Sequence, residues 1–188
     1  LHTQLQARAK PFFSGAEPGG VVLVRKGEQI LRREGFGLAD VENGVPMTAD
    51  KVLPLASVTK QFTAFAVLQL VQAGKLQLDQ PVGDVLAGLP PALARVSLRQ
   101  LLTHTSGVKN ISKIAESRAA RRNEATVDEL IAYFKDLPLE FEPGSRFEYS
   151  NSNYILLTRV IETASGSSYA DYMQKAVFAP LSMSATRF

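Results

Sequence analysis

The sequence predicts an α+β fold in which a β-hairpin near the N-terminus is followed by a long helical region. Two observations lead to this prediction. Residues 21–24 form a short β-branched run that precedes a glycine turn and a second extended segment. From residue 57 onward the hydrophobic residues recur with helical spacing, and the connecting loops are short. We therefore divide the chain into an N-terminal segment that carries the hairpin, residues 1–56, and a helical region, residues 57–188.

The predicted hairpin places Gly27 in a turn between residues 21–24 and a second strand at residues 29–36. Glycine, asparagine and proline recur at residues 35–46, which predicts a loop, and no convincing strand follows residue 37. Because a two-stranded hairpin is only marginally stable by itself, we expect it to belong to a mixed sheet. The C-terminal strands of that sheet are expected to be absent from this chain.

The segment at residues 57–73 carries apolar side chains on almost every side of a helix, which is typical of a helix in the middle of a fold. Gly74 follows directly and is a typical C-terminal stop. Further helices are predicted from two capping boxes and from apolar periodicity. Their expected bounds are 97 to about 104, 126 to about 135, 153–164 with Gly166 as the stop, and 168–178.

The composition is ordinary for a globular protein and excludes several kinds of site. The 188 residues include 21 basic and 18 acidic side chains, for a net charge of +3. No apolar run reaches the roughly 18 residues of a membrane span. The absence of cysteine excludes disulfides, thiolate metal ligands and a cysteine nucleophile. Since there are also only two histidines, we expect neither a metal site nor a cofactor.

One dense group of basic residues lies in the middle of the chain, and no aromatic residues lie between its members. Acidic residues are interspersed, so the pattern is typical of a solvated helical face, and we expect no nucleic-acid partner. The basic residues of this group are Lys109, Lys113, Arg118, Arg121 and Arg122.

Ser57 and Lys60 form the first candidate pair for catalysis. A spacing of three residues puts both side chains on one face of a helix, and a helix N-terminus favours negative charge. Ser57 could then act as a nucleophile, with a half-buried Lys60 taking its proton or stabilising the alkoxide. The alternative is an N-cap serine followed by a surface lysine. The spacing by itself favours that alternative, whereas the apolar surroundings of Lys60 favour catalysis.

Tyr149 and Asn151 form the second candidate pair, where a loop containing Pro143 and Gly144 enters a helix. A tyrosine beside a lysine can relay a proton. An asparagine can donate to a substrate carbonyl while it accepts from the lysine. The alternative is a core tyrosine with Asn151 as a helix N-cap.

His104 is the only histidine of the helical region. A Ser-His-Asp hydrolase would need it as the general base, but the sequence contains no G-x-S-x-G nucleophile elbow. We therefore expect His104 to be structural, joining a helix end to a loop.

Taken together, several segments resemble one family, the serine β-lactamase-related hydrolases. This family includes class C β-lactamases, D-alanyl-D-alanine carboxypeptidases and family VIII esterases. The segments occur in the family's order and approximate spacing, and the resemblance covers the chain from about residue 15. They are residues 55–64, 74–82, 101–107, 141–157 and 180–188.

The resemblance implies a β-lactamase/transpeptidase-like fold and a role for each candidate residue. Ser57 would be the acylated nucleophile, and Lys60 its hydrogen-bonded partner. Tyr149 would assist proton transfer, while Asn151 would contact substrate and Lys60. The triplet Tyr-Ser-Asn at residues 149–151, in place of Ser-Asp-Asn, indicates the class C-like branch.

The family's third motif, Lys-Thr-Gly or His-x-Gly on a strand that lines the pocket, has no match in this sequence. The part of the family fold that carries this motif would also supply most strands of the main sheet. It would supply a second oxyanion donor beside the N–H of Ser57. We therefore expect either a fragment or a chain that a second chain completes.

The resemblance implies a serine hydrolase that forms an acyl-enzyme on a β-lactam, a D-Ala-D-Ala peptide or a small ester, and it leaves the choice open. The alternative is a truncated or degenerate relative with a non-catalytic binding role. The chain lacks an initial Met and a signal-peptide pattern, so we expect a trimmed product. A periplasmic or secreted location is inferred from the family.

Overall fold

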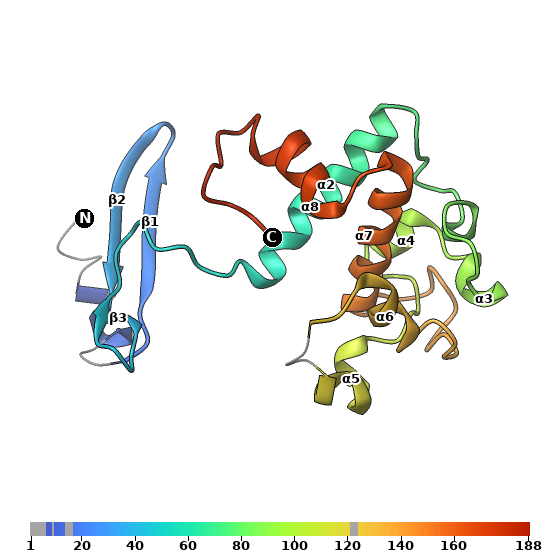
Figure 1. The fold of residues 1–188 in the computed structure, drawn as a ribbon, viewed down its shortest axis with the longest axis horizontal. Helices are drawn as coiled ribbons and strands as arrows, with labels where there is room; N and C mark the ends of the chain where they lie inside the picture. The colour runs from blue at the N-terminus through green and yellow to red at the C-terminus, as the bar shows by residue number, and fades with distance from the viewer. Residues whose placement is uncertain (1–6, 9, 14–16, 121–123) are drawn as a thin grey trace. The chain divides into compact units, whose positions relative to one another are not determined.

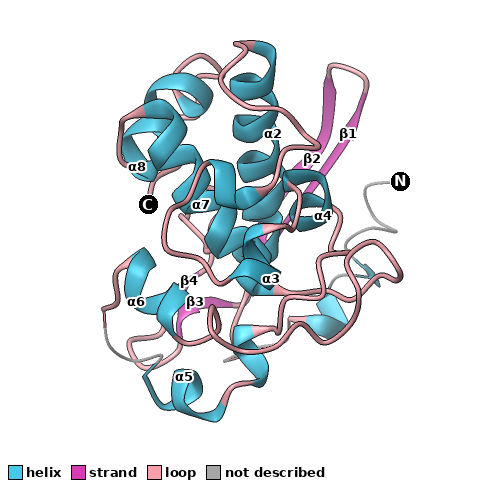
Figure 2. Ribbon diagram, turned by 90° about the vertical axis from the view of Figure 1, so that its right-hand side faces the viewer, coloured by secondary structure: helices cyan, strands magenta, loops and turns pink. Residues whose placement is uncertain are grey.

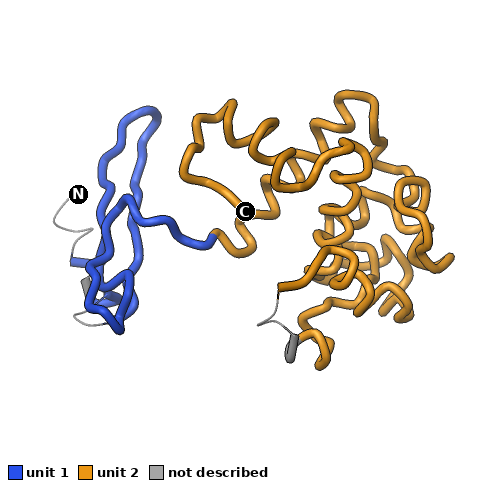
Figure 3. The backbone as a smooth tube through the Cα atoms, in the orientation of Figure 1, with its two compact units in different colours: residues 1–54 blue, residues 55–188 orange. Residues whose placement is uncertain are grey.

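The computed structural model describes residues 7–8, 10–13, 17–120 and 124–188. The chain divides into two compact units, Leu1–Pro54 and Leu55–Phe188 (Figure 3). The boundary expected from the sequence, after residue 56, lies two residues beyond this division. All four candidate site residues lie in the second unit.

The first unit is built on one antiparallel hairpin. Strand β1 (Gly20–Lys26) pairs with strand β2 (Gln29–Phe36) along its whole length (Figure 1). Gly27 lies in the turn at φ 55°, a left-handed conformation that would cost another residue about 1–2 kcal/mol. The predicted hairpin is confirmed.

A second, smaller ladder follows where the sequence predicted only a loop. Strand β3 (Leu38–Asp40) pairs antiparallel with strand β4 (Val45–Pro46), as Figure 2 shows. The prediction of no strand after residue 37 is therefore wrong, because strands of three and two residues are too short to display an alternating pattern. A Cβ atom on Gly35 would lie 2.4 Å from the backbone oxygen of Met47. This glycine thus permits a close backbone approach inside a strand.

The second unit is helical, with long helices α2 (Thr59–Gln72) and α7 (Asn151–Ser165) packed against each other (Figure 1). Turns of 3₁₀-helix and one π-helical run connect the shorter elements. The shorter α-helices are α3 (Pro91–Ala94), α4 (Leu98–Leu102), α5 (Ala115–Ala120), α6 (Val127–Ala132) and α8 (Tyr169–Tyr172). The 3₁₀ turns are Ala56–Val58, Val82–Asp84 and Ile111–Lys113, and the π-helical run is Met173–Phe178.

Helix α2 begins two residues later than expected, because the 3₁₀ turn Ala56–Val58 leads into it. Gly74 adopts φ 71° just beyond its end, so the predicted stop is confirmed. Ala66 is fully buried, whereas Phe65 and Leu68 are each 47% exposed. The expectation of burial on every side is therefore not met in the described structure.

Both predicted capping boxes are present, at Ser97 for α4 and at Thr126 for α6. Helix α6 ends before the expected Lys135. The N–H groups of Phe134 and Lys135 both donate to the carbonyl of Ile131, and the chain leaves the regular α-helical ladder there.

Helix α7 begins at Asn151, two residues before the predicted start, and Gly166 ends it at φ 72° as predicted. The helix expected at residues 168–178 is α8 followed directly by the π-helical run. Side chains from most helices of this unit meet in one core. Its fully buried aliphatic members include Val67, Val82, Val96, Leu98, Leu101, Leu156, Leu157, Val160, Ile161 and Met173.

The predicted basic face is only partly described. Lys113 is about half exposed and pairs with Glu148 and, at 3.8 Å, with Glu140. Arg121 and Arg122, together with the side chain of Arg118, lie outside the described residues. Within the described ranges, no helix is long and apolar enough to cross a membrane, and no three metal-ligating side chains gather closely enough to hold an ion.

Candidate active site

Ser57 lies where the chain turns into α2. Ala56, directly before it, adopts φ 46°, a left-handed conformation that costs a non-glycine residue about 1–2 kcal/mol. Strain of this kind persists where the surrounding structure enforces it, and it is common at functional sites. The Ser57 side chain is exposed and caps neither the 3₁₀ turn nor α2, so the N-cap alternative is wrong.

Lys60 lies one turn along from Ser57 and is half-buried. Its Nζ donates to Oδ1 of Asn151 at 2.8 Å and to Oγ of Ser57 at 3.4 Å. The same Nζ lies 4.9 Å from the ring centre of Tyr149 and 5.4 Å from that of Tyr154. Two ring faces and an amide oxygen thus surround part of the ammonium group, which is not the setting of a simple surface lysine.

Tyr149 immediately precedes the N-cap of α7, and its Oη lies 2.8 Å from Oγ of Ser57. Its side chain is 39% exposed, so the core-tyrosine alternative is wrong. Asn151 is the first residue of α7, and Ser150 is the N-cap, so the capping alternative for Asn151 is wrong as well. The structure therefore brings the side chains of all four predicted residues together.

The environment of Tyr149 favours its ionised form. Partial burial opposes ionisation, but the hydrogen bonds with Lys60 and Ser57, and the charge of Lys60, outweigh it. Together they lower the pKa of Tyr149 below its usual 10.0. Burial instead raises the pKa of Tyr154 and Tyr169. The pKa of Tyr149 is thus shifted in the opposite direction from those of Tyr154 and Tyr169.

His104 supports this group from behind the Tyr149 ring, with the two ring centres 4.5 Å apart. Its Nδ1 accepts from the N–H of Ser150 at 3.2 Å, and its carbonyl accepts from the N–H of Glu148 at 2.9 Å. Burial, and then the charge of Lys60, lowers the pKa of His104 below 6.5. A neutral histidine that joins a helix end to the loop before α7 agrees with the predicted structural role.

Two supporting residues were missed by the sequence reasoning. Asn110 donates from Nδ2 to the backbone oxygen of Tyr149 at 3.2 Å, and Oγ of Ser112 accepts from Nδ2 of Asn151 at 3.0 Å. The only local signal is the Asn-x-Ser spacing, which predicts a side-chain cap on a turn. It carries no information about a contact with residues 149–151.

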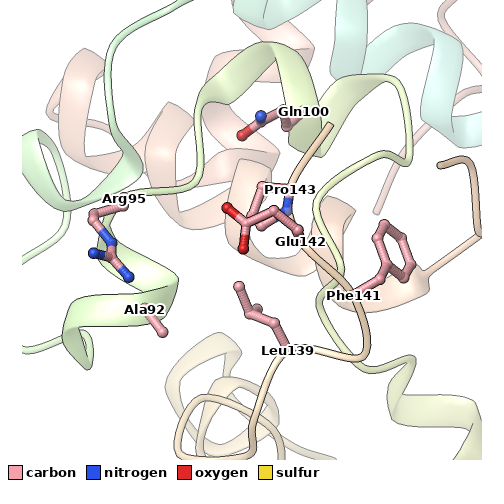
Figure 4. A pocket seen from close by; sticks show the side chains of 7 residues that line it. All are labelled: Ala92, Arg95, Gln100, Leu139, Phe141, Glu142 and Pro143. Carbon is pink, nitrogen blue, oxygen red and sulfur yellow. The ribbon is translucent and has the colours of Figure 1, made fainter. Parts of the chain in front are cut away.

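A hollow of about 250 Å³ adjoins Lys60 and Asn151. Aromatic and aliphatic side chains form much of its wall, from Tyr154, Ile155, Tyr169 and Phe188, and threonines from α2 and α7 complete it. A larger hollow of about 610 Å³ lies elsewhere in the unit and shares no residue with the first (Figure 4). It is lined by Ala92, Arg95, Gln100, Leu139, Phe141, Glu142 and Pro143.

Comparison with known proteins gives one consistent family. The family model described as Beta-lactamase matches residues 4–188. Penicillin-binding protein 4* of Bacillus subtilis (strain 168) is 36% identical over 172 residues, which cover 89% of this chain and 37% of that protein. Esterase EstB of Burkholderia gladioli is 37% identical over 179 residues, which cover 88% of this chain and 45% of that protein.

A solved structure agrees with this assignment. The octameric penicillin-binding protein homologue from Pyrococcus abyssi superposes with a TM-score of 0.77 at 32% sequence identity, over 97% of this chain and 42% of that chain. The expected β-lactamase/transpeptidase-like α+β fold is confirmed by this likeness. The chain thus spans less than half the length of each of these relatives. Because the family model matches almost every residue, the chain belongs to the beta-lactamase family of serine hydrolases.

Proposed function

We propose that the protein is a serine hydrolase that forms an acyl-enzyme on Ser57. The observation that carries this proposal is the contact of Oγ of Ser57 with Oη of Tyr149 at 2.8 Å. Nζ of Lys60 lies 3.4 Å from the same Oγ. A nucleophile within hydrogen-bond reach of a base, which a third group in turn orients, is the arrangement that covalent catalysis requires. Here Tyr149 would be the base, and Lys60 would orient it and hold its charge.

In the proposed reaction, Oγ of Ser57 bonds to the substrate carbonyl carbon while its proton passes to the ionised oxygen of Tyr149. The lowered pKa of Tyr149 supports this role, since it favours the ionised form that must accept the proton. The proton then moves to the leaving group as the bond between that group and the carbonyl carbon breaks. Water then attacks the carbonyl carbon of the resulting ester and gives one proton to Tyr149. That proton passes to Oγ of Ser57 as the bond between this oxygen and the carbonyl carbon breaks, which releases the acid and leaves Tyr149 ionised again.

We propose that Asn151 contacts both the substrate and Lys60. We also propose that the N–H of Ser57 supplies one oxyanion donor. The second donor and the third motif would come from a part of the protein outside these 188 residues, or from a second chain. The shares of 37% and 45% that this chain covers in its relatives support the first source. Two donors matter because one such donor is worth roughly 100- to 1,000-fold in rate.

The proposed substrate is a β-lactam, a D-Ala-D-Ala peptide or a small ester. The names of the two relatives, a penicillin-binding protein and an esterase, support this range. The hollow beside Lys60, at about 250 Å³, suits a small acyl group. We further propose a periplasmic or secreted location, which subcellular fractionation would test.

Intact-mass spectrometry after incubation with a fluorophosphonate, and separately with a penicillin, tests this proposal on the full gene product. We expect an adduct from the fluorophosphonate that a Ser57→Ala variant does not form. An adduct with penicillin as well would point to a β-lactam or D-Ala-D-Ala substrate. Retained labelling of Ser57→Ala would overturn the assignment of the nucleophile. A folded full-length protein with no adduct would instead support the non-catalytic alternative.

A further inference from the structure

The triplet Tyr149 to Asn151 is clamped by one side chain that lies about 40 residues earlier in the chain. Nδ2 of Asn110 donates to the backbone oxygen of Tyr149 at 3.2 Å. Oδ1 of the same side chain accepts from the backbone N–H of Asn151 at 3.3 Å. The N–H of Ser150 donates to Nδ1 of His104, so three backbone groups of the triplet have side-chain partners. This leaves the backbone little freedom to shift Tyr149 relative to Ser57.

The clamp goes beyond what a helix cap requires. Asn110 is the N-cap of the 3₁₀ turn Ile111–Lys113, and its Oδ1 accepts from the N–H of Ser112 at 3.0 Å. A cap needs only a side-chain oxygen, which serine or aspartate would supply equally well. The Nδ2 contact with Tyr149 has no part in capping, and Asn110 is buried, so water does not readily replace a lost partner.

Ser112 holds the other functional side chain of the triplet. Oδ1 of Asn151 accepts from Lys60 at 2.8 Å, while its Nδ2 donates to Oγ of Ser112 at 3.0 Å. An amide oxygen can only accept a hydrogen bond, and Nζ of Lys60 donates to it here. The Ser112 hydroxyl anchors the opposite end of the amide and fixes the plane in which that oxygen lies.

We propose that Asn110 and Ser112 are positioning residues that set the distances from Tyr149 to Ser57 and from Asn151 to Lys60. They act through Tyr149 and Asn151 and are not catalytic residues themselves. This inference rests on the proposed acyl-enzyme function of Ser57. According to this inference, the turn Ile111–Lys113 and its N-cap, Asn110, affect the rate of acylation as well as the stability of the fold.

Three variants of the full gene product separate positioning from stability. Asn110→Ser keeps a capping oxygen but removes the donor to Tyr149, and Ser112→Ala removes the partner of Asn151. Ser112→Thr keeps the hydroxyl and serves as the conservative rescue. We expect the first two to slow fluorophosphonate labelling of Ser57 by roughly 10- to 100-fold, since small misplacements of reacting groups cost that much. Ser112→Thr should stay within about threefold of wild type, since its hydroxyl can make the same contact.

The amplitude of labelling and the rate of labelling report different things. Thr126→Ala, which removes the cap of α6, is the matched control for lost stability, and it should lower the melting temperature without changing the rate. Slow labelling at full amplitude for Asn110→Ser and Ser112→Ala supports positioning. Wild-type rates in both variants overturn it, even if their melting temperatures fall, and leave the proposed function standing. If the wild-type protein is not labelled, the proposed function fails and this inference fails with it.

A spectroscopic titration adds a measurement that needs no activity. The contacts with Lys60 and Ser57 lower the pKa of Tyr149, so a displaced Tyr149 should ionise at a higher pH. We expect the lowest tyrosinate transition, identified by its loss in Tyr149→Phe, to move up in Asn110→Ser and to stay in place in Thr126→Ala. If the tyrosinate transition is unchanged in Asn110→Ser, this contradicts the proposal that Asn110 positions Tyr149.

Discussion

The two units of this chain differ in how much apolar surface they bury. The helical unit holds a continuous cluster of buried side chains, many of them fully inaccessible. In the described part of Leu1–Pro54, only Arg32 and Met47 are buried. Because each fully buried aliphatic side chain contributes about 1.5–3 kcal/mol, the helical unit can stabilise itself. A hairpin unit without such a core cannot.

The difference also explains where the candidate site lies. Ser57 lies in the 3₁₀ turn that leads into α2, and Lys60 lies in the first turn of α2. Tyr149 and Asn151 lie at the start of α7. Since α2 and α7 pack through the core, the same burial that folds the unit brings the two pairs together. All four of these residues belong to the helical unit, Leu55–Phe188.

Separating the units gives the largest expected effect. We expect residues 55–188 alone to keep helical circular dichroism and a cooperative thermal transition, because their core lies within the unit. Residues 1–54 alone should show neither a cooperative transition nor a stable hairpin. Cooperative unfolding of the 1–54 piece would contradict the comparison.

Matched truncations of leucine measure the same difference residue by residue. Leu156 is fully buried, so Leu156→Ala should cost about 2–5 kcal/mol in the free energy of unfolding. Leu23 is 57% exposed, and Leu23→Ala should change it by less than about 0.5 kcal/mol. Urea denaturation followed by circular dichroism would give both values, and similar costs for the two would argue against a core confined to the helical unit.

Local backbone signals sharpen the comparison at a smaller scale. Thr126→Ala should lower the stability of the helical unit by about 1 kcal/mol, because it removes the cap of α6. Gly27→Ala introduces strain of about 1 kcal/mol in the hairpin turn at φ 55°. We expect it to leave the main thermal transition unchanged, and a shift as large as that of Thr126→Ala would show that the hairpin unfolds together with the helices.

The smallest expected effect is a pH dependence that belongs to the helical unit. The pKa of His104 is lowered by burial and by Lys60, so the unfolded chain binds more protons than the folded one below about pH 6.5. Stability contributed by neutral His104 is therefore complete above that pH and is lost as the pH falls toward the lowered value. Urea midpoints at pH 8 and pH 5.5 should differ less in His104→Gln than in wild type. If the two urea midpoints differ as much in His104→Gln as in wild type, the loss of stability at low pH comes from other titratable groups.

Signals that act within a few residues were sufficient to predict much of the fold. The hairpin turn at Gly27, the stops at Gly74 and Gly166, and the caps at Ser97 and Thr126 depend on backbone conformation and hydrogen bonds near each residue. These preferences are present in the unfolded chain as well, so the sequence shows them directly. The second ladder, β3 with β4, escaped because its strands are too short for a periodic signal.

The candidate site divides in the same way. No single motif spacing was enough to name Ser57, Lys60, Tyr149 and Asn151. They were named because the ordered set of segments resembles one family. Their contacts join residues 91 and 92 positions apart, and the supports from Asn110 and Ser112 join residues 39 to 41 positions apart. No local pattern encodes such pairings.

By itself, the sequence determined the caps, the glycine stops, the helical region and the identity of four candidate residues. Only the tertiary structure decided that Tyr149 reaches Ser57 and that the pKa of Tyr149 is lowered. It also decided that the side chain of Asn110 donates to the backbone oxygen of Tyr149. The physical reason is distance along the chain. Capping and turn preferences act over about four residues, whereas these contacts exist only once the burial of α2 against α7 has fixed where distant segments meet.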